Sequence, residues 1–271
     1  MTERIAFIGG GNMASALIGG LIRQGTPPET IDVVEPFADA RSALLRHHGV
    51  LALPEAGAFL AAAGLVVWAV KPQVFHQAAQ AVRLHTGQAL HLSVAAGIRS
   101  DSIAAWLGSE RVVRAMPNTP ALIGKGITAL FARSAVTPLE RKRVSEIIAS
   151  TGDLLWLEAE QHLDAVTALS GSGPAYIFYL LEAMRTAGTE MGLPADQAYQ
   201  LAVATCIGAG ELARASTASP EVLRQRVTSP GGTTHAAISL MEQAGMKSQL
   251  VQAMHAARNR ATAMGDEFGA I

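Results

Sequence analysis

The chain has 271 residues, a formal net charge of −1 and 49% hydrophobic residues, with a mean hydropathy of +0.26. Such a chain is long and apolar enough for a globular protein of two domains. The near-neutral charge and the lack of a basic run argue against nucleic acid as a partner. The one cysteine, Cys206, excludes an internal disulfide, and we expect it to be a buried apolar residue; the histidine spacing predicts no metal site.

The first expected elements are a strand over residues 5–8, a glycine turn and an apolar helix. The turn reads Gly9-Gly10-Gly11-Asn12-Met13-Ala14. This spacing matches the dinucleotide-binding fingerprint: Gly9 makes the tight turn, Gly11 lets the pyrophosphate approach, and Ala14 lets the helix pack closely on the strand. We expect the pyrophosphate at the N-terminus of this helix.

A second strand over residues 31–34 ends in Glu35, about where an acidic side chain bonds the ribose hydroxyls in such folds. A carboxylate there would repel the 2′-phosphate of NADPH, which favours NADH. Arg41 lies about one helical turn further on, within reach of that phosphate. Glu35 pointing into solvent beside Pro36 is the alternative interpretation, so NADPH and NADH both stay candidates.

Further strands are expected over residues 65–70, 89–94, 111–115, 127–132 and 153–157, with helical patterns between the earlier ones. Thr137, Pro138 and Glu140 form a capping signal for a helix that runs to Ser150. After the strand over residues 153–157, from about Glu158 onward, the strand signal stops. We therefore predict an α/β fold: a doubly wound Rossmann domain over residues 1–158, followed by an all-helical domain over residues 159–271.

The helix expected over Pro174–Met191 carries few charges, and such a helix must be covered on most sides. We expect it to lie in a homodimer interface; the alternative is the central helix of a monomeric bundle. The uncharged runs are too short for a membrane span, so no membrane partner is expected. The N-terminal residues lack the pattern of a signal peptide, which makes the cytoplasm the expected compartment.

Where another helix is expected to start, the sequence reads Ser229-Pro230-Gly231-Gly232-Thr233-Thr234. Two glycines let the backbone approach a ligand, the first N–H groups of a helix point outward, and two threonine hydroxyls add donors. This pattern predicts a cradle for a small anionic substrate. The alternative is an ordinary Ser-Pro turn with a threonine as N-cap.

These motifs together resemble the pyrroline-5-carboxylate reductase family over essentially the whole chain. Besides the glycine turn and the cradle, the resemblance rests on Ala69-Val70-Lys71-Pro72-Gln73, Ser93-Val94-Ala95-Ala96-Gly97, Arg114-Ala115-Met116-Pro117-Asn118-Thr119-Pro120 and Leu169-Ser170-Gly171-Ser172-Gly173-Pro174-Ala175-Tyr176. The resemblance implies NAD(P)H-dependent reduction of 1-pyrroline-5-carboxylate to L-proline, the last step of proline biosynthesis. It also implies a helical dimerisation domain, a ring of dimers, and an active site shared between two subunits.

Residue by residue, the resemblance makes Thr234 the candidate catalytic residue, whose hydroxyl hydrogen-bonds the ring nitrogen. Ser229 and the N–H groups of Gly232 and Thr233 would hold the substrate carboxylate, and Glu160 would contact substrate through solvent. Gly231 is the remaining candidate substrate-binding residue. The candidate cofactor residues are Gly9, Gly11, Asn12, Met13, Ala14, Glu35, Ala69, Val70, Lys71, Pro72, Ala95, Ala96, Gly97 and Asn118. Lys71 is expected to act through its backbone, and stabilising its own turn is the alternative for Asn118.

The sequence bears on three other functions. A β-hydroxyacid dehydrogenase needs a lysine on the central helix of its second domain, whereas the only lysine here after residue 160 is Lys247. A reductase of a six-membered cyclic imine stays open, because one methylene changes pocket contacts by only about 1 to 3 kcal/mol. The remaining alternative is a non-catalytic NAD(P)-binding regulatory protein. The family often has asparagine where this chain has Arg226, which bears on cofactor preference.

Overall fold

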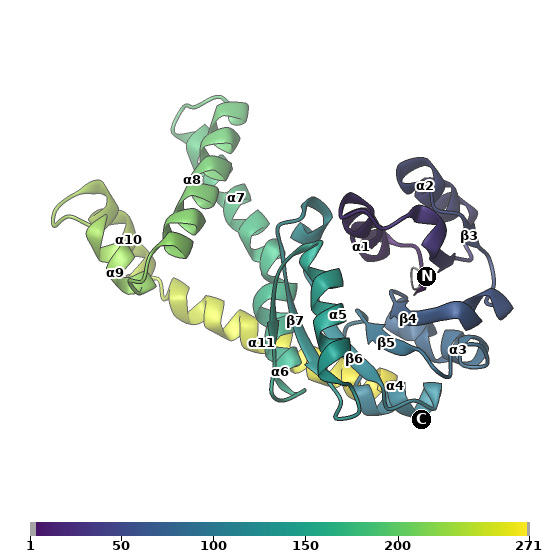
Figure 1. Cartoon of the computed structure of the whole chain (residues 1–271). Coiled ribbons are helices and arrows are strands. Elements are labelled where there is room, and N and C mark those ends of the chain that lie inside the picture. The colour runs from purple at the N-terminus through teal and green to yellow at the C-terminus, as the bar shows by residue number, and fades with distance from the viewer. Residues whose placement is uncertain (1–3, 270–271) are drawn as a thin grey trace. The chain divides into compact units, whose positions relative to one another are not determined.

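The computed structural model describes residues 4–269, which divide into two compact units (Figure 1). The first unit contains the described residues up to Ser172 and, in addition, those from Ala257 onward. The second contains Gly173–Ala256. The last strand ends at Trp156, close to the predicted boundary after residue 158, but residues 159–172 and the C-terminal segment pack with the first unit.

A sheet of eight strands forms the first unit within the described residues. Their order is β3-β2-β1-β4-β5-β6-β7-β8, and every neighbouring pair is parallel except β6 and β7. The bounds are β1 (Arg4–Ile8), β2 (Ile31–Val34), β3 (Ala52–Leu53), β4 (Ala63–Trp68), β5 (Leu90–Ser93), β6 (Val112–Met116), β7 (Gly126–Ala132) and β8 (Gly152–Trp156). This order, with its switch between β1 and β4, confirms the predicted doubly wound Rossmann fold.

Helices cover both faces of this sheet. They are α1 (Asn12–Arg23), α2 (Ala38–His48), α3 (Pro72–Val82), α4 (Ser100–Leu107), α5 (Pro138–Ala149) and α6 (His162–Val166), with short 3-10 helices at Pro28–Thr30, Ala58–Ala62 and Thr119–Ile123. One core layer packs α1, α2 and α5 on the sheet through residues such as Leu17, Leu44 and Ile148. The other packs α3 and α4 through Phe75 and Ile103. Thr137 and Glu140 form the predicted capping box of α5.

The second unit is helical, as predicted. It contains α7 (Gly173–Glu190), α8 (Ala195–Ala215), α9 (Pro220–Arg226), α10 (Thr233–Gln243) and the first half of α11 (Met246–Gly269). A π-helical turn at Thr167–Gly171 leads from α6 into α7. Cys206 on α8 is half-buried rather than fully buried.

The predicted central helix, α7, is largely uncovered within this chain. Among its described residues only Leu181 and Gly188 are buried, whereas Phe178 and Tyr179 are 59% and 75% exposed. That exposure does not fit the alternative of a monomeric bundle in which α7 is enclosed on all sides. No helix in the described part of the chain combines the length and hydropathy that crossing a bilayer requires.

Candidate active site

The loops that carry the predicted cofactor residues lie together because of the strand order. Strands β1, β4, β5 and β6 are consecutive neighbours, so the loops that follow β1, β4 and β5 leave the same edge of the sheet. The Ala69 N–H donates to Ile8 O at 2.8 Å, and the Val94 N–H donates to Trp68 O at 3.0 Å. Ligands of open α/β sheets bind at this edge, next to the switch in strand order.

The glycine turn after β1 has the geometry that a pyrophosphate needs. Gly9 has a φ of +94°, and a Cβ built there would lie 2.6 Å from the carbonyl oxygen of Ala69, so no larger residue fits. Gly11 is the N-cap of α1, has no neighbouring atom within 4 Å of such a Cβ, and supplies no side-chain cap. The first N–H groups of α1 therefore face an open approach, which fits the phosphates of a dinucleotide.

Glu35 at the end of β2 points inward. It is 6% exposed, and its two carboxylate oxygens accept hydrogen bonds from the N–H groups of Gly10 at 2.7 Å and Phe37 at 2.8 Å. The alternative in which Glu35 points into solvent is therefore wrong. Arg41 donates from Nη1 to the carbonyl oxygens of Glu35 at 3.0 Å and Pro36 at 2.6 Å, which holds its guanidinium along the same loop.

Two other loops contribute at this edge. Lys71 is exposed and is the N-cap of α3, with Pro72 as the first helical residue. Gly97 has a φ of +79°, and a Cβ there would lie 2.9 Å from the Met264 Cβ of α11. The Asn118 Oδ1 atom accepts a hydrogen bond from the Ile127 N–H on β7 at 3.0 Å, so this side chain ties the segment after β6 to β7. A cofactor contact by Asn118 stays a prediction.

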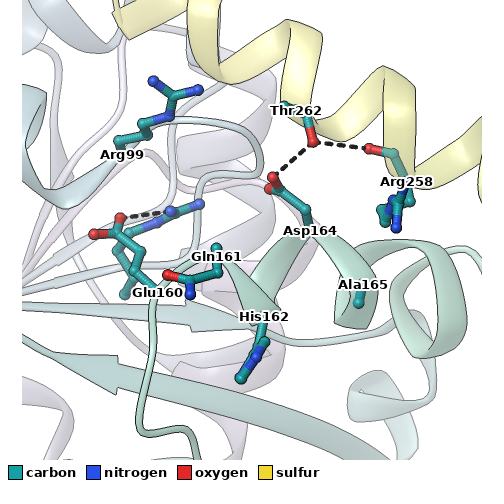
Figure 2. A pocket seen from close by; sticks show the side chains of 9 residues that line it. Arg99, Glu160, Gln161, His162, Asp164, Ala165, Arg258 and Thr262 are labelled. Atoms are coloured by element: carbon teal, nitrogen blue, oxygen red, sulfur yellow. Dashed lines mark hydrogen bonds and ion pairs between the residues drawn. The ribbon is translucent and has the colours of Figure 1, made fainter.

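Glu160 forms hydrogen bonds within the first unit. Its Oε1 atom accepts from the Ser100 N–H and from Arg114 Nη1, both at 2.6 Å, and its Oε2 atom accepts from the Ser100 hydroxyl at 2.5 Å. It also lines a cavity of about 610 Å³, shown in Figure 2. There the Thr262 hydroxyl donates to Asp164 Oδ2 at 2.9 Å. The predicted contact with substrate stays a prediction, while Ser100 and Arg114 are partners that the sequence motifs did not indicate.

The predicted cradle lies in the second unit, between α9 and α10. Gly231 has a φ of +74°, Gly232 is the N-cap of α10, and the helix begins at Thr233, as expected. The Gly232 N–H donates to Ser229 O at 3.0 Å, so it closes the turn instead of facing a ligand, contrary to expectation. No side chain caps α10, which leaves the start of this helix open beside the exposed Ser229 and Thr233.

A doubly wound sheet with an open glycine turn at its switch point, followed by a helical unit with a polar cradle, defines a nicotinamide-dependent oxidoreductase of two domains. A family model described as pyrroline-5-carboxylate reductase dimerisation matches residues 160–264, and one described as NADP oxidoreductase, coenzyme F420-dependent, matches residues 4–97. The chain belongs to the pyrroline-5-carboxylate reductase family and is an NAD(P)H-dependent oxidoreductase.

Full-length similarities support this membership. The chain is 42% identical to a pyrroline-5-carboxylate reductase of Pseudomonas aeruginosa, with 99% of both chains covered, and 37% identical to one of Pisum sativum, with 94% of both covered. A solved structure of the enzyme from Coxiella burnetii matches with a TM-score of 0.89 and 36% identity over 97% of this chain and 99% of that one. The Plasmodium falciparum structure, which has NADP bound, matches with a TM-score of 0.88 and 26% identity over 97% and 98%.

Proposed function

We propose that this chain reduces 1-pyrroline-5-carboxylate to L-proline with NAD(P)H. The observation that carries the proposal is the 42% identity to a pyrroline-5-carboxylate reductase over nearly the full length of both chains. The open glycine turn and the polar cradle support it, because the reaction needs one site for a dinucleotide and one for a small carboxylate. The bound nicotinamide supplies a hydride to the imine carbon.

On the substrate side, Ser229, Gly231, Thr233 and Thr234 would form the site. The Ser229 hydroxyl and the Thr233 N–H would hold the substrate carboxylate. The left-handed conformation of Gly231 shapes the turn that presents these groups. The Thr234 hydroxyl would hydrogen-bond the ring nitrogen and orient the imine. A hydroxyl is too weak an acid to protonate the ring, so the imine binds already protonated and Thr234 contributes orientation.

On the cofactor side, the loops that follow β1, β2, β4, β5 and β6 at the carboxyl edge of the sheet would hold the dinucleotide. The glycine turn with Asn12, Met13 and Ala14 would take the pyrophosphate, and the buried Glu35 would set the turn that meets the ribose. The nicotinamide half would lie along the remaining residues, which are Ala69, Val70, Lys71, Pro72, Ala95, Ala96, Gly97 and Asn118.

The working assembly would be a homodimer in the cytoplasm, with a ring of dimers as the larger form. The match of residues 160–264 to a dimerisation family supports association of this helical region. The exposed aromatic side chains of α7 support it independently, because contiguous apolar surface of this kind typically marks an interface.

The reaction is tested by following the oxidation of NADPH and NADH by absorbance with racemic pyrroline-5-carboxylate and by identifying the product. We expect oxidation with proline formed, and the ratio of the two rates gives the cofactor preference that Glu35 and Arg41 set. The six-membered cyclic imine carboxylate is assayed in parallel. Faster oxidation with that substrate would replace the assignment, and cofactor binding without turnover on either would favour a regulatory role.

A further inference from the structure

Glu160 links three segments of the first unit. It lies just before α6, and its carboxylate accepts from the backbone and side chain of Ser100, the first residue of α4, and from Arg114 on β6. The chain separations are 60 residues to Ser100 and 46 to Arg114. One side chain therefore connects the start of α4, the middle of β6 and the segment that leads into the second unit.

The partners of the Glu160 carboxylate are buried, so breaking these hydrogen bonds costs more stability than breaking exposed ones would. Ser100 is 1% exposed and Arg114 is 6% exposed. A buried guanidinium needs a counter-ion, because removing one partner of such a pair leaves an uncompensated charge in a poorly solvated place. The Glu160 carboxylate is that counter-ion for Arg114. It also accepts from the N–H at the start of α4, where a negative charge is stabilised.

Both anchored positions adjoin predicted cofactor loops. Ser100 ends the loop that contains Ala95, Ala96 and Gly97, and Arg114 lies on β6 shortly before Asn118. Arg133 Nη1 also donates to the Ser100 hydroxyl at 3.3 Å, and this hydrogen bond further stabilises the start of α4. A change in the length or charge at position 160 would thus displace both loops together.

We propose that Glu160 is a positioning residue that holds these two loops at the spacing the nicotinamide half of the cofactor requires, rather than a contact of the substrate. The proposal rests on the cofactor loops named under the proposed function. It assigns Glu160 an effect on cofactor affinity, whereas a substrate contact would act on the imine alone.

The test compares Glu160→Gln with the unchanged chain by titrating NADPH fluorescence in the absence of imine. We expect the Kd for NADPH to rise about tenfold, because Gln keeps one acceptor but loses the charge that pairs with Arg114. The KM for the imine at saturating NADPH should change by less than about twofold. The matched control is Glu158→Gln, an exposed carboxylate two residues earlier, for which the Kd should not change.

Two further variants keep the proposal falsifiable if Glu160→Gln does not fold. Ser100→Ala removes the hydroxyl contacts with Glu160 and Arg133 but keeps the backbone N–H bond to Glu160, and it should raise the Kd for NADPH about threefold. Arg114→Lys keeps the positive charge beside Glu160 and should bind NADPH more tightly than Arg114→Met.

Three results would overturn the proposal: a raised KM for the imine with an unchanged Kd for NADPH, a lower melting temperature with both unchanged, or an equal loss in Glu158→Gln. NADPH binding is measured without imine. The comparison of Kd values for NADPH therefore stays interpretable even if the chain does not reduce pyrroline-5-carboxylate.

Discussion

The two units of this chain differ in how much of their own apolar surface they enclose. The first unit buries large side chains on both faces of its sheet, including Phe7, Leu17, Trp68 and Phe75. In the second unit, the described helices α7 and α8 bury only small residues and Leu181. A Rossmann sheet thus completes its core from one chain, whereas this helical pair leaves its aromatic side chains for another surface to cover.

The candidate site follows the same division. The glycine turn and its neighbouring loops belong to the unit with the complete core, while the cradle around Thr234 belongs to the unit without one. Cofactor binding should therefore depend on the first unit alone. Turnover should depend on both units and on the association of two chains.

The largest effect is expected from Phe178→Glu on α7, where Phe178 is 59% exposed in the single chain. A charge buried without a partner in an interface costs on the order of 3 to 5 kcal/mol, so the dimer dissociation constant should rise at least about 100-fold. Analytical ultracentrifugation checks this, with Leu84→Glu, an equally apolar exposed site on the first unit, as control. An unchanged dimer would show that α7 is not the interface, whereas NADPH binding should persist in either case.

Thr234→Ala tests the cradle without touching the first unit. Losing one positioned donor typically costs on the order of 10² in kcat, and we expect that fall here with an unchanged Kd for NADPH. Ser239→Ala, further along α10, is the matched control and should retain full turnover. Equal turnover in Thr234→Ala and the unchanged chain would remove this hydroxyl from the reaction, and a weakened NADPH affinity would contradict the separation of the two sites.

Two glycines of the same turn should respond differently to alanine. At Gly9 the positive φ and the 2.6 Å approach to Ala69 O should cost about 3 kcal/mol of unfolding free energy. At Gly11 the space is open, so Gly11→Ala should leave stability within about 0.5 kcal/mol and weaken NADPH binding instead. Urea unfolding and cofactor titration measure both. Loss of stability in Gly11→Ala would mean that the open space beside it is not available.

The sequence was sufficient for much of the first unit because its signals are local. Buried parallel strands appear as short apolar runs, and seven of the eight strands were predicted; β3, at two residues, is too short to give a pattern. The packing of the last part of α11 against the first unit was not predicted. Its helical periodicity does not indicate which domain covers it, although Gly265 and Met264 lie against Gly97.

The sequence predicts a site residue well where motif spacing determines its position, and poorly where its contacts depend on the conformation of a loop. The position of the glycine turn and the start of α10 follow from motif spacing. The inward turn of Glu35 and the use of the Gly232 N–H within its own turn depend on loop conformation, which spacing does not specify. A charged residue inside an apolar strand pattern, Arg114, is a signal that a buried counter-ion exists, but nothing local identifies Glu160 as that partner.

The smallest effect is expected from pH, and it should arise in the first unit. His91 on β5 is 1% exposed and accepts a hydrogen bond from Trp68 Nε1 at 3.2 Å. Burial, aided by the charge of Arg111, lowers the pKa of His91 to about 4, although a backbone hydrogen bond with Thr86 acts in the opposite direction. Between about pH 6.5 and pH 4 the unfolded chain binds a proton that the folded chain does not. Unfolding free energy should therefore fall by about 2 kcal/mol from pH 8 to pH 5.

His91→Gln keeps an acceptor for Trp68 but does not titrate. The unfolding free energy of this variant should therefore lack the fall of about 2 kcal/mol between pH 8 and pH 5. Urea unfolding at pH 8 and pH 5 measures the difference between the two chains. An identical pH dependence in both would show that the pKa of His91 is the same in the folded and the unfolded chain. A shift of the monomer–dimer equilibrium with pH, in place of the unfolding transition, would assign the titration to the association of the helical unit and not to the core of the sheet.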